Sequence, residues 1–133
     1  MGRQRIGIDV VPLERIRQSL EAEPSRYTAK FLTPAESSYC RGSRLVERLA
    51  GRIAAKEAVM KLLGDGWPNV AWTDIEVISS GKRPEVRLSG KASALAASLA
   101  MEADSLDVSV THDGGIAIAV ATGLFGDVSK EEG

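Results

Sequence analysis

Two carboxylates and a lysine carry the clearest chemical signal in this sequence. Asp9 stands inside a short apolar run, and an ionised carboxylate is seldom buried unless a cation pairs with it or it binds a metal. Glu57 and Lys61 are four residues apart, so they share one face if their segment is helical. The simpler alternatives are a solvent-exposed Asp9 and a plain Glu57–Lys61 ion pair, which contributes little to stability.

His112 is the only histidine, and it stands just before the glycine turn Asp113–Gly115. A single histidine excludes a His-rich metal cage and is more often structural, but at such a turn it could donate to a phosphate. No Walker loop, dinucleotide-binding glycine pattern, GxSxG elbow or HExxH motif is present. Taken separately, these places indicate a candidate magnesium and phosphate site.

Basic residues concentrate in the first half of the chain. Residues 12–61 contain ten Lys or Arg and six Asp or Glu, a balance of +4, whereas residues 62–133 contain five and eleven, a balance of −6. This asymmetry favours an anionic ligand or partner, although ordinary solvated helix faces are the simpler explanation.

The elements that position these residues can be predicted from hydrophobic spacing and from start and stop signals. Thr33 before Pro34, with Glu36 three residues after the cap, is a strong helix start, and Gly64 stands where a helix C-cap is expected. Asp113–Gly115 is a hairpin signature. We expect strands at Arg5–Val11, Trp72–Ile78, Glu85–Leu88, Asp107–His112 and Ile116–Thr122, and helices at Leu13–Leu20, from Thr33 to near Gly42, at Leu45–Leu63 and at Lys91–Glu102.

This order favours an α+β domain in which an antiparallel sheet packs against a long central helix. A length of 133 residues suits one domain, which we expect over residues 1–126 with a polar tail over 127–133. No apolar run is long enough to cross a bilayer, and the lone Cys40 cannot form an internal disulfide, so a cytoplasmic protein is expected.

Taken in this order, the motifs resemble the holo-acyl-carrier-protein synthase branch of the phosphopantetheinyl transferases from Ile6 to Gly123. The matching segments are Gly7–Val11 with Glu14–Ile16, Phe31–Glu36, Gly51–Ala58 with Lys61, Trp72–Glu76, Gly81–Pro84 and Ser109–His112. Three departures stand out. Ile53 replaces a usual aromatic residue, Thr111 replaces the second serine of an SxSH-like motif, and the Lys82–Pro84 turn is one residue longer than the common Gly-Lys-Pro.

The resemblance implies transfer of the phosphopantetheine arm of coenzyme A to a serine of acyl carrier protein. It implies a Mg²⁺ ion held by Asp9 and Glu57, since magnesium takes one or two carboxylates together with substrate phosphates. Lys61 would stabilise charge on the diphosphate, and Glu57 or a water on the metal would be the base. The implied coenzyme A contacts are Arg44, Arg48, Arg52, Lys61, Thr111 and His112.

The resemblance also implies a homotrimer with active sites between subunits. Carrier docking would use Arg15, Arg17 and Arg26, in fatty-acid or polyketide synthesis, and no nucleic-acid or membrane partner is expected. Two alternatives remain open. One is a non-catalytic module that binds an anionic protein or nucleic acid, and the other is a magnesium-dependent hydrolase of coenzyme A-like diphosphates.

Overall fold

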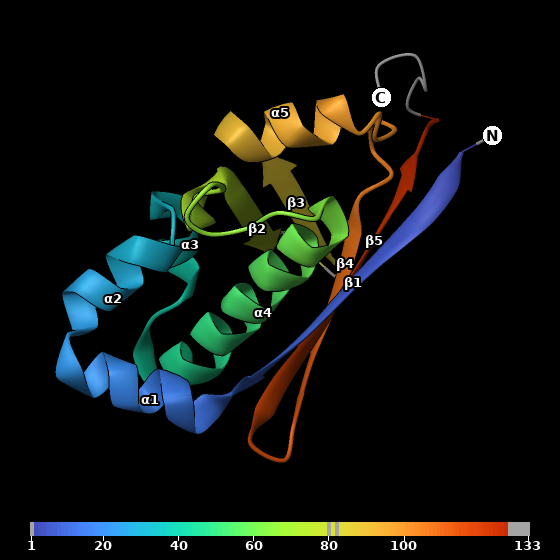
Figure 1. Ribbon diagram of the computed structural model, residues 1–133. Coiled ribbons are helices and arrows are strands. Elements are labelled where there is room, and N and C mark those ends of the chain that lie inside the picture. Colours follow the sequence, from blue (N-terminus) through green and yellow to red (C-terminus); the bar gives the residue numbers. More distant parts are fainter. Residues whose placement is uncertain (1, 80, 82, 128–133) are drawn as a thin grey trace.

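The structure is a computed structural model that describes residues 2–79, 81 and 83–127, so the predicted polar tail lies outside the described residues except for Asp127. Figure 1 shows a long helix, α4, lying between a twisted sheet and a layer of shorter helices. The elements in chain order are β1 (Arg3–Pro12), α1 (Leu13–Ala22), α2 (Pro24–Phe31), α3 (Pro34–Tyr39), η1 (Gly42–Arg44), α4 (Leu45–Leu63), η2 (Trp72–Asp74), β2 (Ile75–Ser79), β3 (Pro84–Leu88), α5 (Gly90–Ser98), β4 (Asp107–Asp113) and β5 (Ile116–Phe125).

Both sheets are antiparallel, which confirms the predicted fold class. One sheet has three strands in the order β1-β5-β4, and the other is the separate hairpin β2-β3. The β4–β5 hairpin turns at Gly114 and Gly115, whose φ angles of 56° and 79° lie in the left-handed region that glycine adopts without strain. The sequence therefore identified this hairpin through its turn residues.

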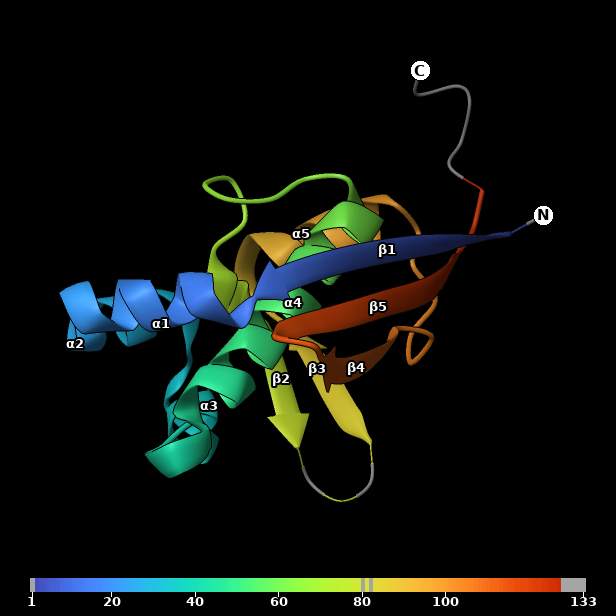
Figure 2. The ribbon, with the colours of Figure 1, turned by 90° about the horizontal axis from the view of Figure 1, so that it is seen from below.

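Small side chains let α4 lie close to the three-stranded sheet (Figure 2). Ala117, Ala119 and Ala121 alternate along β5 and are fully buried, as is Ala58 of α4. Gly7 of β1 marks the closest approach, because a Cβ built there would lie 1.9 Å from the carbonyl oxygen of Ala58. The backbones of β1 and α4 are therefore in direct contact, which only glycine at position 7 permits.

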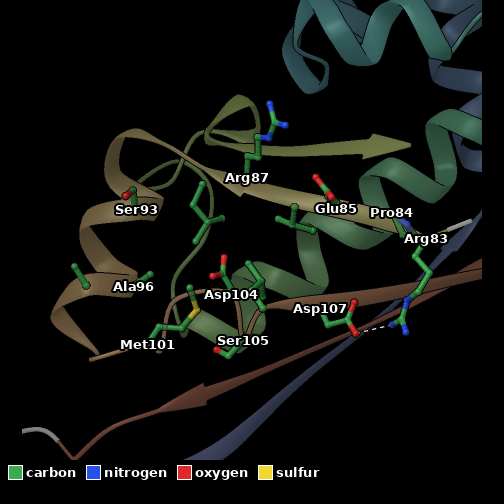
Figure 3. A pocket seen from close by; sticks show the side chains of 14 residues that line it. Arg83, Pro84, Glu85, Arg87, Ser93, Ala96, Met101, Asp104, Ser105 and Asp107 are labelled. Atoms are coloured by element: carbon green, nitrogen blue, oxygen red, sulfur yellow. Dashed lines mark hydrogen bonds and ion pairs between the residues drawn. The ribbon is translucent and has the colours of Figure 1, made fainter. Parts of the chain in front are cut away.

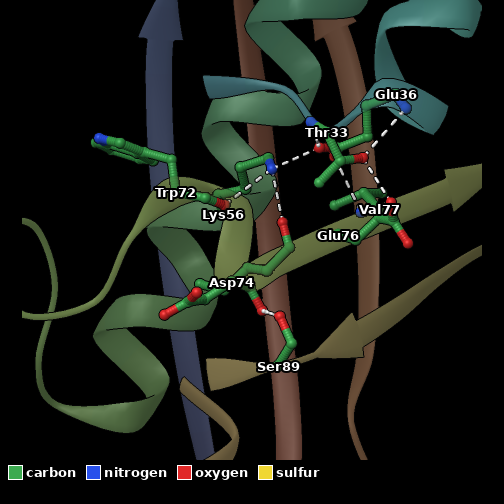
Figure 4. A network of polar contacts seen from close by, with 9 residues as sticks. Thr33, Glu36, Lys56, Trp72, Asp74, Glu76, Val77 and Ser89 are labelled. Carbon is green, nitrogen blue, oxygen red and sulfur yellow. Dashed lines mark hydrogen bonds and ion pairs between the residues drawn. The ribbon is translucent and has the colours of Figure 1, made fainter. Parts of the chain in front are cut away.

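A buried ion pair fixes α4 against α3 and β2 (Figure 4). Lys56 Nζ donates to Glu36 Oε1 at 2.7 Å, to the Ile75 carbonyl at 2.6 Å and to the Trp72 carbonyl at 3.0 Å. Both charged side chains are fully buried. Burial lowers the pKa of Lys56, and the charge of Glu36 and its hydrogen bond oppose that shift. Glu36 also accepts from the backbone N–H of Val77, so one pair joins three elements.

Helix starts and stops were predicted best. α4 covers the predicted residues, and its C-cap Gly64 has a φ of 82°. The predicted capping box at Thr33 and Glu36 is formed, with Thr33 N donating to Glu36 Oε1 at 3.0 Å. The helix α3 that it opens is shorter than predicted and ends at Tyr39 instead of near Gly42.

Two further expected elements differ from the structure, and one helix was not expected. The strand predicted from Trp72 begins only at Ile75, because Trp72–Asp74 forms a 3₁₀ turn in which the Asp74 carboxylate accepts from Ala71 N at 3.4 Å. The last helix stops at Ser98, before Ala100 with its φ of 57°. The helix α2 was not predicted, although Pro24 at its first position is a typical start signal.

The sheet face turned away from α4 is apolar and open. Ile6, Ile8 and Val10 of β1 are 64%, 54% and 47% exposed, and Leu124 of β5 is 45% exposed. Alternation along β1 turns these three residues outward, so Asp9 and Val11 face α4. Among the described residues, no helix is long and apolar enough to span a membrane.

Candidate active site

Asp9 and Lys61 meet where β1 crosses α4. Lys61 Nζ donates to Asp9 Oδ1 at 3.0 Å and to the Ile8 carbonyl at 3.0 Å. Asp9 is 9% exposed, and its second oxygen, Oδ2, is buried with no hydrogen-bond partner among the described residues. The Lys61 ammonium therefore satisfies one half of the carboxylate and leaves the other half available to a further cation or donor.

Glu57 projects to the same place from the preceding turn of α4. The pKa of Glu57 is raised to about 7, mainly by burial and also by the adjacent Asp9 carboxylate, against the opposing charges of Arg15 and Lys61. Lys61 forms its ion pair with Asp9, and no Glu57–Lys61 ion pair is present among the described residues, so the plain helical pair does not explain these residues.

The donor set at this place suits a hard divalent cation. Mg²⁺ is usually held by one or two carboxylates, with water and substrate phosphates as its other ligands. The unpartnered Oδ2 of Asp9 and the neighbouring Glu57 carboxyl fit that requirement. Over residues 2–79, 81 and 83–127, no cluster of three or more His, Cys, Asp or Glu side chains could form an all-protein metal cage.

A cavity of about 580 Å³ lies on the other side of α4, between that helix, β4 and the β2–β3 hairpin. Arg48, Arg52 and His112 line it together with Tyr39 and Ser79. Arg52 is only 7% exposed, and its Nη2 donates to Ser79 Oγ at 2.7 Å. Its Nε is buried with no partner among the described residues. The cavity thus has a basic wall that suits an anion.

His112 is fixed against α4 at the end of this cavity. Its Nε2 lies 2.8 Å from the carbonyl oxygen of Glu47, which requires a proton on Nε2. Gly51 makes room for the ring, since a Cβ there would lie 3.2 Å from Nε2. The imidazole is therefore held by α4 through Nε2, and Nδ1 takes no part in that bond.

Three of the predicted coenzyme A contacts lie outside the cavity: Lys61, which lies beside Asp9, and Arg44 and Thr111. Arg44 is exposed and pairs with Glu47 at 3.4 Å, so its charge is already balanced. Thr111 is exposed and does not line the cavity, although Val110 and His112 on either side of it do. Of the three predicted arginines, the structure brings only Arg48 and Arg52 together.

The carboxylate residues and the cavity residues occupy opposite edges of the sheet. Asp9 of β1 and Val110 of β4 both pair with Ala119 of the central strand (Figure 2). Neighbouring strands are about 4.8 Å apart, so the edge strands are roughly 10 Å apart. Asp9, Glu57 and Lys61 are absent from the described lining of the cavity. The predicted site residues therefore form two separate groups in one chain.

The predicted docking arginines lie on α1 and α2, but their settings differ. Arg17 pairs with Glu14, and Arg26 pairs with Glu23 at 3.4 Å, each within one helical turn. Arg15 is close enough to Glu57 for its charge to lower the pKa of that carboxyl. Arg15 is thus the docking candidate beside the carboxylate group.

Sequence reasoning missed Tyr39 and Ser79 in the cavity. Arg48 and Arg52 stack on the Tyr39 ring, with their guanidinium carbons 4.4 and 4.3 Å from its centroid. No spacing rule links a residue at the end of α3 to two arginines on α4. The excess of arginine around an aromatic residue was the only available signal.

A second hollow, of about 840 Å³, lies between β3, α5 and the segment before β4 (Figure 3). Arg83 and Asp107 form an ion pair at one end, and Val86, Leu88 and Met101 supply apolar walls. None of the predicted site residues lies in its described lining.

Comparisons with known proteins show to which family the chain is similar. Residues 5–121 match the family model of the 4′-phosphopantetheinyl transferase superfamily. The holo-[acyl-carrier-protein] synthase of Desulforudis audaxviator is 39% identical over 120 residues, covering 89% of this chain and 92% of the relative. That of Frankia alni is 43% identical over 116 residues, covering 86% and 92%.

A solved structure extends the likeness to three dimensions. The crystal structure of Helicobacter pylori holo-[acyl-carrier-protein] synthase in complex with coenzyme A superposes with a TM-score of 0.75 at 32% identity, covering 87% of this chain and 96% of that one. The chain therefore belongs to the 4′-phosphopantetheinyl transferase superfamily, within its holo-[acyl-carrier-protein] synthase branch.

Proposed function

We propose that this protein transfers the 4′-phosphopantetheine arm of coenzyme A to a serine of apo-acyl carrier protein, releasing adenosine 3′,5′-bisphosphate. The observation that carries the proposal is the Asp9–Glu57–Lys61 group, because two adjoining carboxylates with a lysine suit a metal-bound diphosphate. The cavity with Arg48 and Arg52 supports it, since it offers cations to the nucleotide phosphates. The close relatives bear the same activity in their names.

The reaction needs one bond made and one broken. The serine oxygen of the carrier bonds to the β-phosphorus of coenzyme A, and the bond from that phosphorus to the bridging oxygen breaks. The serine proton passes to a base, for which Glu57 is the candidate side chain in this group, and the bridging electron pair leaves with adenosine 3′,5′-bisphosphate. Lys61, held as a cation by Asp9 and the Ile8 carbonyl, stabilises the negative charge of the diphosphate.

Asp9 and Glu57 are the residues that would hold Mg²⁺. The bound ion would neutralise the diphosphate and so favour departure of the nucleotide. The unpartnered Oδ2 of Asp9 supports this assignment, because a buried carboxylate oxygen with no donor is costly without a cation.

The separation of the two groups supports a homotrimer with sites between subunits. Asp9 on β1 and His112 on β4 lie at opposite edges of one sheet, so a single chain cannot present both to one small ligand easily. The β1 edge with Asp9 is called here the carboxylate edge, and the β4 edge beside Arg48 and Arg52 the arginine edge. Contact between the carboxylate edge of one subunit and the arginine edge of the next would bring the two groups of residues together. The open apolar face with Ile6, Ile8 and Val10 supports such an assembly.

Arg15, Arg17 and Arg26 would receive the acidic carrier. Arg15 is the central contact, because its charge reaches Glu57 and is not taken up in an ion pair among the described residues. Arg17 and Arg26 would first have to leave Glu14 and Glu23, which are exposed partners that contribute little.

Mass spectrometry of an apo-acyl carrier protein tests the proposal. The carrier is incubated with coenzyme A and this protein, with magnesium or with chelator. We expect a gain of one phosphopantetheine that needs magnesium and is abolished by Asp9→Ala or Glu57→Ala. Cleavage of coenzyme A without any carrier would favour the hydrolase instead. Intact coenzyme A with several unmodified carriers would favour the binding module.

A further inference from the structure

The two arginines of the cavity are held by an aromatic ring. The guanidinium carbons of Arg48 and Arg52 lie 4.4 and 4.3 Å from the ring centroid of Tyr39. Arg48 also donates to the Tyr39 carbonyl at 2.9 Å. Neither arginine forms an ion pair with a carboxylate among the described residues. The Tyr39 ring is therefore the side chain that both cations share.

An aromatic ring orients a cation without cancelling its charge. Arg48 and Arg52 are four residues apart on α4, where like charges repel. The negative face of a tyrosine ring attracts a guanidinium and so offsets that repulsion. Arg44, one turn earlier, shows the contrast, because Glu47 balances its charge. The stack on Tyr39 leaves two positive charges available to an anion.

The surroundings of Arg52 indicate which kind of anion the two stacked arginines suit. Its side chain is 93% buried, its Nε has no partner among the described residues, and its one hydrogen bond goes to the neutral hydroxyl of Ser79. A buried cation without a counter-charge is unfavourable until an anion arrives. A phosphomonoester carries nearly two negative charges and several acceptor oxygens, so it suits two convergent guanidinium groups.

We infer that Tyr39 is a positioning residue that aligns Arg48 and Arg52 for the terminal phosphomonoester of the nucleotide. This inference rests on the proposed function, in which that group is the 3′-phosphate of coenzyme A. Tyr39 acts through the two arginines, so its loss should weaken discrimination between nucleotides with and without that phosphate. A purely structural role would weaken both alike.

Calorimetric titration with adenosine 3′,5′-bisphosphate and adenosine 5′-monophosphate tests the inference on the full-length protein. Tyr39→Leu should bind the bisphosphate about tenfold more weakly than the wild type, in line with the loss of two cation–π contacts. Its affinity for the monophosphate should change less than about twofold. Tyr39→Phe keeps the ring and should bind both nucleotides like the wild type, because the hydroxyl has no part in the stack.

The outcomes separate this inference from the proposed function. If the wild type prefers the bisphosphate and Tyr39→Leu keeps that preference, Tyr39 does not position the arginines and the transferase proposal is untouched. If the wild type has no such preference, both the inference and the nucleotide assignment fail. Should Tyr39→Leu not fold, Tyr39→Gln also removes the ring, and the ratio of its affinities for the bisphosphate and the monophosphate gives the same test. In turnover, the expected change is a raised KM for coenzyme A with kcat retained.

Discussion

At the scale of single residues, the negative charges of the adjacent Asp9 and Glu57 carboxyl groups repel each other in the metal-free protein. Burial and Asp9 raise the pKa of Glu57 from 4.5 to about 7. Between about pH 4.5 and 7, Glu57 is therefore protonated in the folded protein and ionised in the unfolded chain. Glu57 supports stability below about pH 4.5, and that support is lost as the pH rises through 7.

Glu57→Gln should therefore stabilise the metal-free protein at pH 8. A shift of this size on a partly exposed group, discounted for screening by solvent, corresponds to about 1–2 kcal/mol. Glutamine does not titrate, so the gain should disappear near pH 5. Urea unfolding in chelator at both pH values measures it. An equal gain at pH 5 and pH 8 would show that ionisation of Glu57 is not the cause.

Lys56→Met should be strongly destabilising although Lys56 touches no predicted ligand site. The change leaves the Glu36 carboxylate buried without its cation, which costs about 3–5 kcal/mol. Adding Glu36→Gln should recover much of this loss, since the buried charge is then gone. Denaturant unfolding of both variants checks the coupling, and strictly additive losses would contradict it.

Local signals in the sequence, an acid in an apolar strand and a four-residue helical spacing, singled out Asp9 and the Glu57–Lys61 pair separately, and the structure brings the three residues together. The sequence did not predict that Lys61 pairs with Asp9, or that Lys56 pairs with Glu36. These partners are 52 and 20 residues apart, and no local pattern specifies contacts at such separations.

At the scale of elements, the seam between β1 and α4 depends on Gly7. A methyl group at position 7 would overlap the Ala58 carbonyl, whose oxygen lies 1.9 Å from the built Cβ. Backbone atoms cannot move aside as a side chain would, so Asp9 would be displaced with its strand.

Gly7→Ala should cost at least about 3 kcal/mol, the upper range for overpacking in a core, and should abolish transferase activity. Gly42→Ala is the control. Gly42 has a φ of 76° with nothing within 4 Å of a built Cβ, so the cost should be only about 1 kcal/mol with activity retained. Thermal and urea unfolding compare the two variants, and equal losses would contradict the role of the seam.

The main helices and the hairpin were predictable because their ends carry specific residues: Thr33 with Glu36, Gly64, and Gly114. Element lengths were less predictable. Trp72–Asp74 has strand-like composition, yet the Asp74 cap turns it into a helical turn. Such an outcome depends on one side-chain hydrogen bond, which competes with residue preference.

At the scale of the whole molecule, the exposed apolar face of β1 is the surface on which the proposed trimer depends. The alternation Ile6, Ile8, Val10 turns the apolar side chains away from the core and the acidic Asp9 towards it. This inverted pattern, with apolar residues outward and an acidic residue inward, can be recognised in the sequence. Whether a partner covers the outward face depends on the shape of the folded surface, which the sequence pattern does not give.

Ile8→Glu should give a folded monomer without transferase activity, because a charge cannot be buried unpaired in an apolar interface. Light scattering after gel filtration reports the mass, and circular dichroism reports the fold. A variant that stays trimeric and active would place the interface elsewhere.

Mixing two impaired variants tests whether sites combine residues of neighbouring subunits. Glu57→Ala lacks the carboxylate edge and Arg48→Ala weakens the arginine edge. In randomly mixed trimers, one interface in four joins two intact edges, so about a quarter of wild-type activity should return. Activity that remains at the level of the separate variants would place each site within one chain.

Residues without a functional side-chain group set the geometry of the residues that have one. Gly7, Ala58 and Ala119 carry no functional group, yet they hold the distance between strand and helix across which Asp9 and Lys61 meet. A saturation-mutagenesis survey should therefore find this seam among the least tolerant parts of the chain. Redesign for other nucleotide donors should leave the seam intact and vary the walls of the arginine cavity.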